Sequence, residues 1–263
     1  MDFIKMLTPR AGLRVLITGG ASGIGLAIAK AFVSTGARVH VCDVDPKAID
    51  AVSSISPSIT GTRADVANQD DVKRVFEDVR RNLGGLDVLI NNAGIAGPTG
   101  GIDAIESGDW EKTIDVNLNS QYTFSREAVP MLREAQDGGV IVFMSSVAGR
   151  LGYGFRTPYA ATKWAVVGLA KSLAIELGPD NIRVNAVQPG IVKGPRMEGV
   201  IAARAKQLGI GYEEMEQQYL AKISLRRMVT QEEIAASVLY LSSPAGSAIS
   251  GQALSVCGNV ETL

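Results

Sequence analysis

Histidine and cysteine are scarce in this sequence, and their scarcity narrows the chemistry open to it. The 263 residues include one histidine, His40, and two cysteines, Cys42 and Cys257, which form no CxxC pair. Zinc sites and disulfide scaffolds need several such residues at characteristic spacings. We therefore expect no metal site, a reduced chain and, by default, a cytoplasmic location.

Excess charge and long apolar runs are lacking as well. The chain has 26 Lys and Arg against 27 Asp and Glu, so electrostatics give no reason to expect a nucleic-acid partner. No apolar run reaches the length of a membrane span, and the run within residues 1–10 is too short for a signal peptide. We expect no membrane partner and no secretory leader.

Apolar residues and glycine are abundant. Hydrophobic residues make up 46% of the chain and glycines number 29, which is typical of a packed α/β protein with many tight turns. A chain of this length can form one large domain or two small ones. Because no repeat, low-complexity tract or linker divides it, we expect a single domain over residues 1–263.

A glycine-rich turn near the N-terminus predicts a nucleotide site. A mostly apolar run at 13–18, typical of a buried parallel strand, leads into the turn 19–25, an apolar-rich helix at 26–34 and a second strand at 37–42. Glycine permits a tight turn and close approach to a pyrophosphate, and a helix N-terminus attracts phosphate. The alternative is a glycine turn without a ligand. The expected cofactor-binding residues here are Gly19, Ser22, Gly23, Ile24 and Gly25.

Asp43 ends the second strand and bears on which dinucleotide is bound. It lies 18 residues after Gly25, where a carboxylate can accept hydrogen bonds from a ribose diol. A carboxylate there would repel a 2′-phosphate, which favours NAD over NADP. Arg38 and Arg63 are the cations that keep NADP open as an alternative.

The rest of the chain alternates between apolar patterns typical of strands and apolar patterns typical of helices. Strands are expected at 59–64, 86–90, 139–144, 182–188 and 253–257, and helices at 46–55, from about 70, at 110–135, 158–177 and 232–241. Seven strands alternating with helices predict a Rossmann-like, doubly wound parallel sheet. A polar helical segment interrupted by Gly209 and Gly211 is expected to form a substrate lid at about 194–225.

Polar residues follow several of these strands, where ligands of open α/β sheets bind. Asp65 either contacts an adenine ring or caps the following helix. The run from Asn91 to Gly94 suits close approach of a cofactor, although an Asx turn is the alternative. His40, inside the second strand, is expected in or near the core.

Tyr159 and Lys163 form the most suggestive pair. They lie four residues apart in an expected helix and so share one helix face. A tyrosine titrates near pH ~10, and a neighbouring ammonium lowers that value. The pair is therefore a candidate proton-transfer unit; an ordinary exposed Tyr and Lys is the alternative.

The order and spacing of these motifs resemble those of the classical short-chain dehydrogenase/reductase family. The resemblance covers residues 13–257 and rests on the runs 18–25, 91–94, 159–163 and 189–190 together with Asn117 and Ser146. It implies that Tyr159 is the general acid/base and that Lys163 lowers its pKa and holds the nicotinamide ribose. Ser146, chosen over Ser145 because it precedes Tyr159 by 13 residues, would bind the substrate oxygen. Asn117 would hold a water beside Lys163.

The same resemblance implies a cofactor lining and an assembly. Besides the glycine turn, Tyr159 and Lys163, the lining would comprise Asp43, Asp65, Val66, Asn92, Ala93, Gly94, Pro189, Gly190 and Val192. Gly194 departs from the family, because many relatives carry a threonine there that contacts the cofactor; Lys193 or Arg196 could compensate. The family implies a homotetramer, with the helix at 158–177 at one interface.

We therefore expect an NAD-dependent oxidoreductase that interconverts a secondary alcohol, or a sugar hydroxyl or hemiacetal, with its carbonyl form. Arg150, Arg156 and Arg196 flank the expected pocket and suit an acidic group, which favours a small polar polyol, sugar or hydroxy acid. Solvated or interface arginines are the alternative. Two other functions stay open: a 3-oxoacyl-type ketone reductase, which would usually use NADPH, and a non-catalytic dinucleotide-binding protein.

Overall fold

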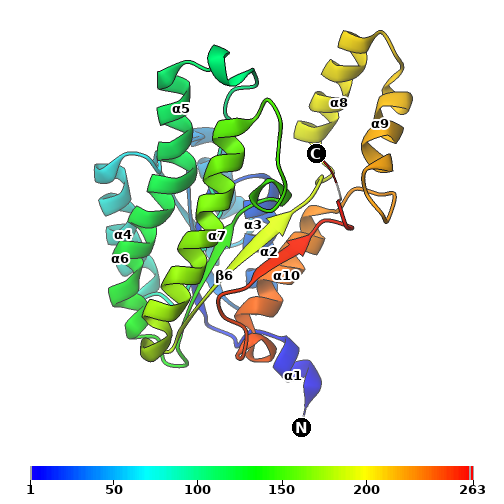
Figure 1. The fold of residues 1–263 in the computed structure, drawn as a ribbon. Helices are drawn as coiled ribbons and strands as arrows, with labels where there is room; N and C mark the ends of the chain where they lie inside the picture. Colours follow the sequence, from blue (N-terminus) through cyan, green and yellow to red (C-terminus); the bar gives the residue numbers. More distant parts are fainter. Residues whose placement is uncertain (1, 261, 263) are drawn as a thin grey trace.

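A parallel sheet forms the centre of the computed structural model, which describes residues 2–260 and 262, except for the side chains of Arg196 and Gln207 (Figure 1). Within this part of the chain the sheet has seven strands in the order β3-β2-β1-β4-β5-β6-β7, which confirms the expected Rossmann-like fold. The strands are β1 Arg14–Thr18, β2 Arg38–Asp43, β3 Ile59–Arg63, β4 Val88–Asn91, β5 Gly139–Met144, β6 Ile182–Pro189 and β7 Ala253–Val256.

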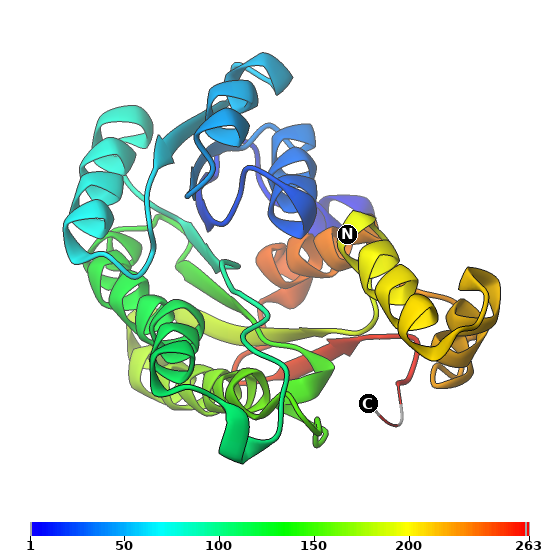
Figure 2. The same ribbon diagram turned by 90° about the horizontal axis from the view of Figure 1, so that it is seen from above.

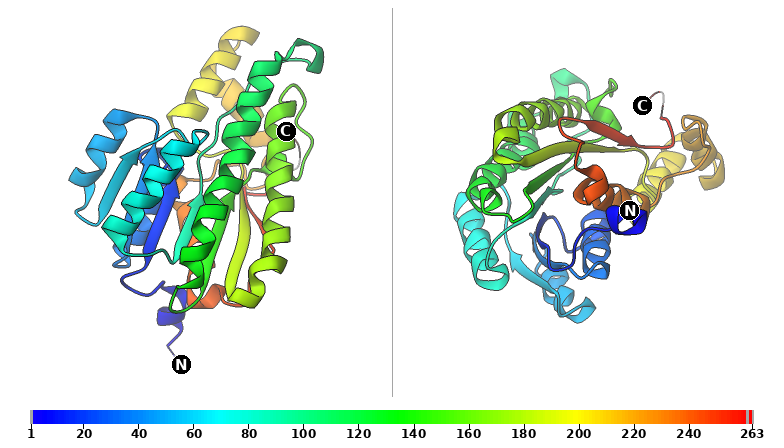
Figure 3. Two further views of the ribbon diagram at one scale, coloured as in Figure 1. Left: turned by 90° about the vertical axis from the view of Figure 1, so that its left-hand side faces the viewer. Right: turned by 90° about the horizontal axis from the view of Figure 1, so that it is seen from below.

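Helices cover both faces of the sheet (Figure 3). They are α1 Phe3–Leu7, α2 Gly23–Ser34, α3 Pro46–Ile55, α4 Gln69–Leu83, α5 Ser107–Ile114, α6 Ser120–Arg133, α7 Thr157–Leu177, α8 Pro195–Leu208, α9 Tyr212–Ala221 and α10 Gln231–Ser242. Helices α2, α3 and α10 pack on one face, and α4, α6 and α7 on the other. Within the described residues, no helix has the length and apolar character needed to cross a bilayer.

The strands bury both faces because their side chains alternate. In β1, Val15 and Ile17 join the hydrophobic cluster under α2 and α10, while Leu16 joins the cluster under α4, α6 and α7. Such alternation within a wholly apolar strand is what a parallel sheet covered on both sides requires. Val75 and Phe76 of α4 are buried in the second cluster.

The strand order indicates where a ligand would bind. Chain order reverses between β1 and β4, which are neighbours in the sheet although two strands separate them in sequence. A crevice opens at such a switch point, beyond the carboxyl ends of the strands. The glycine turn after β1 and the run 92–94 after β4 meet at this edge. Helices α8 and α9 extend from the body of the molecule at the same end of the sheet (Figure 1) and lie to one side of it when seen from above (Figure 2).

Two features were not predicted. Helix α1, capped by the side chain of Asp2, precedes the sheet. The helix expected over 110–135 is interrupted by a π-helical turn, Asp115–Asn119, in which the Ser120 N–H donates to the Asp115 carbonyl five residues back. Such a turn has no compositional signature, and it often marks a functional site.

The capping alternative for Asp65 is wrong. Helix α4 begins at Gln69, and the side chain of Asn68 accepts hydrogen bonds from the Asp70 and Asp71 N–H groups. Asp65 instead accepts from the Ala67 N–H, forming a local Asx turn. Helix α2 also begins earlier than expected, at Gly23, because Ser22 already has the extended backbone of an N-cap residue.

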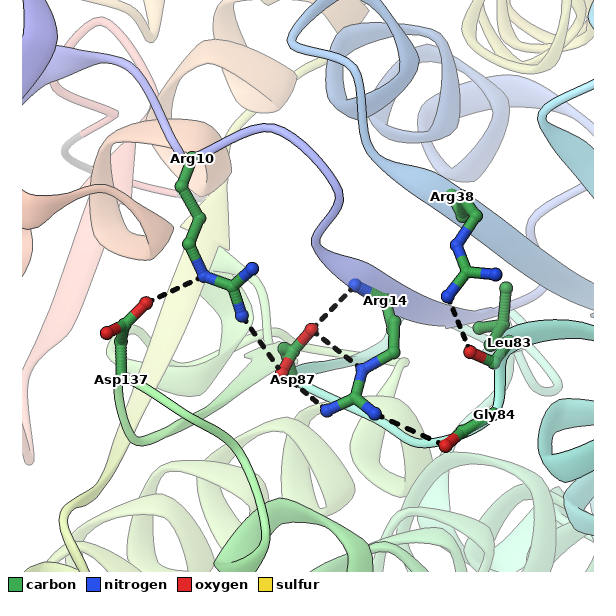
Figure 4. Close-up of polar contacts among 7 residues, drawn as sticks. All are labelled: Arg10, Arg14, Arg38, Leu83, Gly84, Asp87 and Asp137. Atoms are coloured by element: carbon green, nitrogen blue, oxygen red, sulfur yellow. Dashed lines mark hydrogen bonds and ion pairs between the residues drawn. The ribbon is translucent and has the colours of Figure 1, made fainter.

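An ion cluster fastens the opposite, amino-terminal edge of the sheet (Figure 4). Asp87 accepts from the backbone N–H and from the guanidinium of Arg14, and it also pairs with Arg10. Arg10 pairs in turn with Asp137. Burial alone would raise the pKa of Asp87, but the Arg14 hydrogen bonds and the two positive charges hold it below its usual value. The carboxylate therefore stays ionised and joins β1 to the start of β4.

Replacing Asp87 should weaken folding much more than replacing Asp137. The Asp87 side chain is 2% exposed and that of Asp137 is 63% exposed, although both pair with Arg10. Removing one partner of a buried pair costs about 3 kcal/mol, whereas an exposed pair contributes less than about 1 kcal/mol. Urea denaturation of Asp87→Ala and Asp137→Ala measures the difference; equal losses would contradict this account.

His40 is buried, as expected, and lies in a polar chain that crosses β2 and β3. Its ring nitrogens contact the Thr60 and Thr62 hydroxyls at 2.7 and 3.0 Å. Thr62 donates to Asp78, so the Nε2 of His40 must donate to Thr62. Burial lowers the pKa of His40 to about 4, well below the value of about 6.5 expected in the unfolded chain.

This depressed pKa predicts acid lability. Because the unfolded chain binds a proton at His40 more readily, the contribution to stability is complete above pH ~6.5 and is lost as the pH falls towards 4. The loss between pH 7 and 4.5 should be about 2.5 kcal/mol. Measuring the free energy of unfolding at these two pH values tests this prediction. His40→Gln cannot titrate, so its free energy of unfolding should fall by about 2.5 kcal/mol less than that of the wild-type protein.

Candidate active site

Two positions of the turn between β1 and α2 require glycine. Gly19 has a φ of +59°, in the left-handed region. A Cβ on Gly25 would lie 2.1 Å from the Gly19 carbonyl oxygen. Ser22 is the N-cap of α2, and its side chain makes no capping bond there. The turn therefore presents the free N–H groups of a 12-residue helix to the crevice, with a spare hydroxyl beside them.

Asp43 closes the side of this turn. One carboxylate oxygen accepts from the Ala21 N–H at 3.2 Å and the other from the Asp45 N–H, also at 3.2 Å. The carboxylate is thus fixed between the end of β2 and the glycine turn, at the edge where the ribose of a dinucleotide was expected. Asp65 is exposed and Val66 is buried, and both follow β3 on the same edge.

The run after β4 is tied to the glycine turn. The side-chain amide of Asn92 donates to the Thr18 and Gly19 carbonyls at 3.0 and 2.9 Å. The Thr18 hydroxyl accepts from the Asn92 and Ala93 N–H groups, both at 3.0 Å. Asn92 therefore shapes the turn through both bonds that its amide donates. Sequence reasoning missed Thr18, although a buried hydroxyl at a strand end before a glycine turn was a usable signal.

Tyr159 and Lys163 lie in the first turns of α7, which begins at Thr157, one residue earlier than expected. The Lys163 Nζ is 5.6 Å from the centre of the Tyr159 ring and donates to the Met144 carbonyl at the end of β5. Lys163 is only 4% exposed. The two side chains therefore share one face of α7 and point at the carboxyl end of the sheet, as the spacing predicted.

The two serines after β5 are distinguished by their partners. The Ser145 hydroxyl donates to the Lys163 carbonyl at 2.7 Å and so fastens α7 to the sheet. The Ser146 hydroxyl accepts from the Ala148 N–H at 3.2 Å, which leaves its proton for another acceptor. This arrangement is compatible with the choice of Ser146 over Ser145.

Asn117 lies in the π-helical turn and is fully buried. Its Oδ1 accepts from the Ile95 N–H at 2.7 Å, and its Nδ2 donates to the Ile95 carbonyl and the Thr162 hydroxyl. A Cβ on Gly94 would lie 3.2 Å from the Asn117 Oδ1 and 3.4 Å from the Lys163 Nζ. Asn117 thus braces the loop after β4 against α7, and both of its amide hydrogens are used in doing so.

The three arginines differ in position. Arg150 donates to the Val260 carbonyl, so its guanidinium is held by the C-terminal segment. Arg156 donates to the Ala96 carbonyl at 2.7 Å, and its guanidinium carbon lies 5.4 Å from the ring centres of both Tyr153 and Tyr159. The side chain of Arg196 lies outside the described residues.

The last predicted segment follows β6. The Gly190 N–H donates to the Val256 carbonyl, and a Cβ on Gly190 would lie 2.6 Å from the Cys257 Cβ. Val192 pairs with Val229 in an isolated parallel bridge. Gly194, with a φ of +155°, is the N-cap of α8. Pro189, Gly190 and Val192 therefore lie at the carboxyl end of β6, at the edge shared with the glycine turn.

Comparison with known proteins places this arrangement in a family. A family model described as enoyl-(acyl carrier protein) reductase matches residues 19–259. The chain is similar to the 3-oxoacyl-(acyl-carrier-protein) reductase FabG of Thermotoga maritima, with 34% identity over 93% of this chain and 96% of the relative. It is also similar to the L-fucose dehydrogenase of Bos taurus, with 33% identity over 98% of this chain and 93% of the relative.

A solved structure agrees with these sequence matches. The crystal structure of NAD⁺-bound xylitol dehydrogenase superposes with a TM-score of 0.88 and 27% identity, over 95% of this chain and 99% of that one. The resemblance seen in the motifs is confirmed by the matched residues and by the fold. The chain is an oxidoreductase and belongs to the short-chain dehydrogenase/reductase family.

Proposed function

We propose that this protein is an NAD-dependent dehydrogenase that interconverts a secondary alcohol, or a sugar hydroxyl or hemiacetal, with its carbonyl form. The observation that carries the proposal is the convergence of two units at one edge of the sheet. The glycine turn with Asp43 follows β1 and β2, and the Tyr159–Lys163 face of α7 lies against the end of β5. A dinucleotide bound at the glycine turn would thus lie at the same edge of the sheet as the proposed proton-transfer pair.

The residues at this edge fit a dinucleotide. Gly19, Gly23, Gly25 and the N-terminus of α2, with Ser22 and Ile24, would hold the pyrophosphate, since the turn has no space for a Cβ at Gly25. Asp43 would accept from the adenosine ribose. The remaining contacts are assigned to Asp65, Val66, Ala93, Gly94, Pro189, Gly190 and Val192, with Asn92 holding the turn in shape.

The nicotinamide supplies hydride acceptance or donation when it is bound. The Tyr159 hydroxyl exchanges the proton with the substrate oxygen, and the Lys163 ammonium beside its ring stabilises the phenolate form. Ser146 donates its free hydroxyl proton to the substrate oxygen and so stabilises developing negative charge. Asn117 holds the Ile95 loop and Thr162 in place around this pair.

The substrate side of the proposal rests on Arg156 and on helices α8 and α9. Arg156 lies against the Tyr159 ring and can attract an oxyanion. The segment at about 194–225 forms its own small apolar cluster, which includes Ile201 and Met215, and would close over the crevice as a lid. We infer a small polar polyol, sugar or hydroxy acid, in keeping with the L-fucose and xylitol named for two similar proteins.

Assembly and location are part of the same proposal. Helix α7 exposes Trp164 and Ile175 on its outer face, which suits a subunit interface in a homotetramer. A cytoplasmic location follows from the reduced state proposed for its two free, buried cysteines.

A 3-oxoacyl-type ketone reductase is the second candidate. It is favoured by the similarity to the Thermotoga maritima reductase. Asp43 speaks against a cofactor with a 2′-phosphate. Measuring whether the protein prefers NAD or NADP therefore helps to distinguish the two candidate functions. A non-catalytic role is the third, and the intact set of Asn117, Ser146, Tyr159 and Lys163 speaks against it.

Removing one hydroxyl should remove turnover. Tyr159→Phe keeps the aromatic ring but cannot exchange a proton, so kcat should fall by about 10²-fold or more. Tyr153→Phe is the matched control, because both rings lie 5.4 Å from the Arg156 guanidinium; it should retain most activity. NADH formation with a panel of neutral and acidic polyols measures both. Full activity in Tyr159→Phe would refute the assignment.

Neutralising Asp43 should relax cofactor choice. The wild-type protein should favour NAD, and Asp43→Asn should lower the ratio of kcat/KM for NAD over NADP by about tenfold or more, since a like-charge contact costs several kcal/mol. Asp45→Asn, which removes the exposed carboxylate capping α3, is the control. A ratio that changes equally in both variants would count against a direct ribose contact at Asp43.

A further inference from the structure

A buried glutamine contacts the π-helical turn from the start of α6. Gln121 is 1% exposed, and its Nε2 donates to the backbone carbonyl of Asn117 at 2.8 Å. The donor is a side-chain amide and the acceptor is the carbonyl four residues back, so the Gln121 side chain bonds directly to the backbone of the π-helical turn. The Oε1 of Gln121 has no hydrogen-bond donor among the described residues.

Stability does not account for this glutamine. A buried acceptor without a donor costs about 1–3 kcal/mol. Methionine has a similar length and flexibility and would leave no unsatisfied oxygen of its own at this position. Buried polar groups that are only partly satisfied are uncommon in native proteins and call for a specific reason. The bond that Gln121 donates offers such a reason.

That bond holds the backbone of the residue that braces the site. The Asn117 side chain bonds both the N–H and the carbonyl of Ile95 and the hydroxyl of Thr162. Asn117 Oδ1 also borders the same space at Gly94 as the Lys163 Nζ. A rotation of the Asn117 peptide would therefore displace the loop after β4 and alter the surroundings of Lys163.

The carbonyl of Gln121 is fastened as well. It accepts from the Ser125 hydroxyl at 2.7 Å, and Ser125 accepts in turn from the side chain of Asn91 at 3.1 Å. Asn91 is the last residue of β4, directly before the run that carries Asn92 and Gly94. Gln121 is thus held from the strand side through its backbone, while its side chain reaches the π-helical turn.

We propose that Gln121 is a positioning residue for the dehydrogenase reaction. Through the Asn117 carbonyl it fixes the π-helical turn, and through that turn it sets the placement of Ile95, Gly94 and Lys163 around Tyr159. This role rests on the proposed function, because it concerns the rate of that reaction; the hydrogen bonds from which it is inferred belong to the fold.

Gln121→Met tests the role by removing the donor while keeping the length of the side chain. We expect kcat to fall about tenfold, since small displacements of reacting groups are costly, with little change in the KM for NAD. The melting temperature should change little, because the variant loses one hydrogen bond but also removes the unpaired Oε1 of Gln121. Ser242→Ala is the control: it removes a buried side-chain bond to the carbonyl four residues back in α10, so it should lower the melting temperature but retain kcat, because the bond from Gln121 to Asn117 stays.

Gln121→Glu gives a second test, in which the pH dependence of kcat is measured; a purely structural role would not change that dependence. Only the protonated carboxyl can donate to the Asn117 carbonyl, and burial raises the pKa of an introduced carboxyl. The ratio of variant to wild-type kcat should therefore rise as the pH falls. A pH-independent ratio, or wild-type kcat in Gln121→Met, would overturn the role of Gln121 and leave the proposed function standing. A wild-type protein without turnover would overturn both.

Discussion

The buried ammonium of Lys163 is the constraint on which the site depends. A charged group that is 4% exposed is stable only where polar partners replace its hydration. The Met144 carbonyl of β5 accepts from it, and the Tyr159 ring of α7 lies beside it. The loop after β4 and the π-helical turn complete its surroundings, because Lys163 Nζ and Asn117 Oδ1 both lie within 3.4 Å of where a Cβ on Gly94 would be. The surroundings of one charged group therefore come from four parts of the chain.

Three local departures from regular structure lie in or next to these surroundings. The π-helical turn interrupts a long helix, Gly94 leaves space where any side chain would crowd Lys163 and Asn117, and Gln121 donates to a helix carbonyl. Regular packing would be less costly at all three places. Their concentration within one network indicates that the geometry around Lys163 takes precedence there over local stability.

The sequence was sufficient for the parts of the fold that hydrophobic pattern and turn chemistry control. The apolar strand patterns and the glycine turn at 19–25 predicted the sheet and the edge at which this turn lies. The four-residue spacing predicted that Tyr159 and Lys163 share one helix face. The bond partners of Asn117 and Asn92 could not be predicted, because they are distant in sequence and involve backbone groups. Asp65 was ambiguous for the same reason: an acid before a helix can cap it or form a turn, and only the three-dimensional path of the chain decides.

The arginines show where sequence reasoning stops and why. Arg150 and Arg156 lie six residues apart on one connection, and both suit an acidic substrate by residue type alone. In the fold one reaches the Val260 carbonyl and the other reaches Tyr159. Substrate preference therefore depends on loop paths and on the placement of α8 and α9, which the sheet does not dictate. The glycine turn, by contrast, is built on strand ends and one helix N-terminus, so a dinucleotide bound there as proposed would keep its place while the substrate changes.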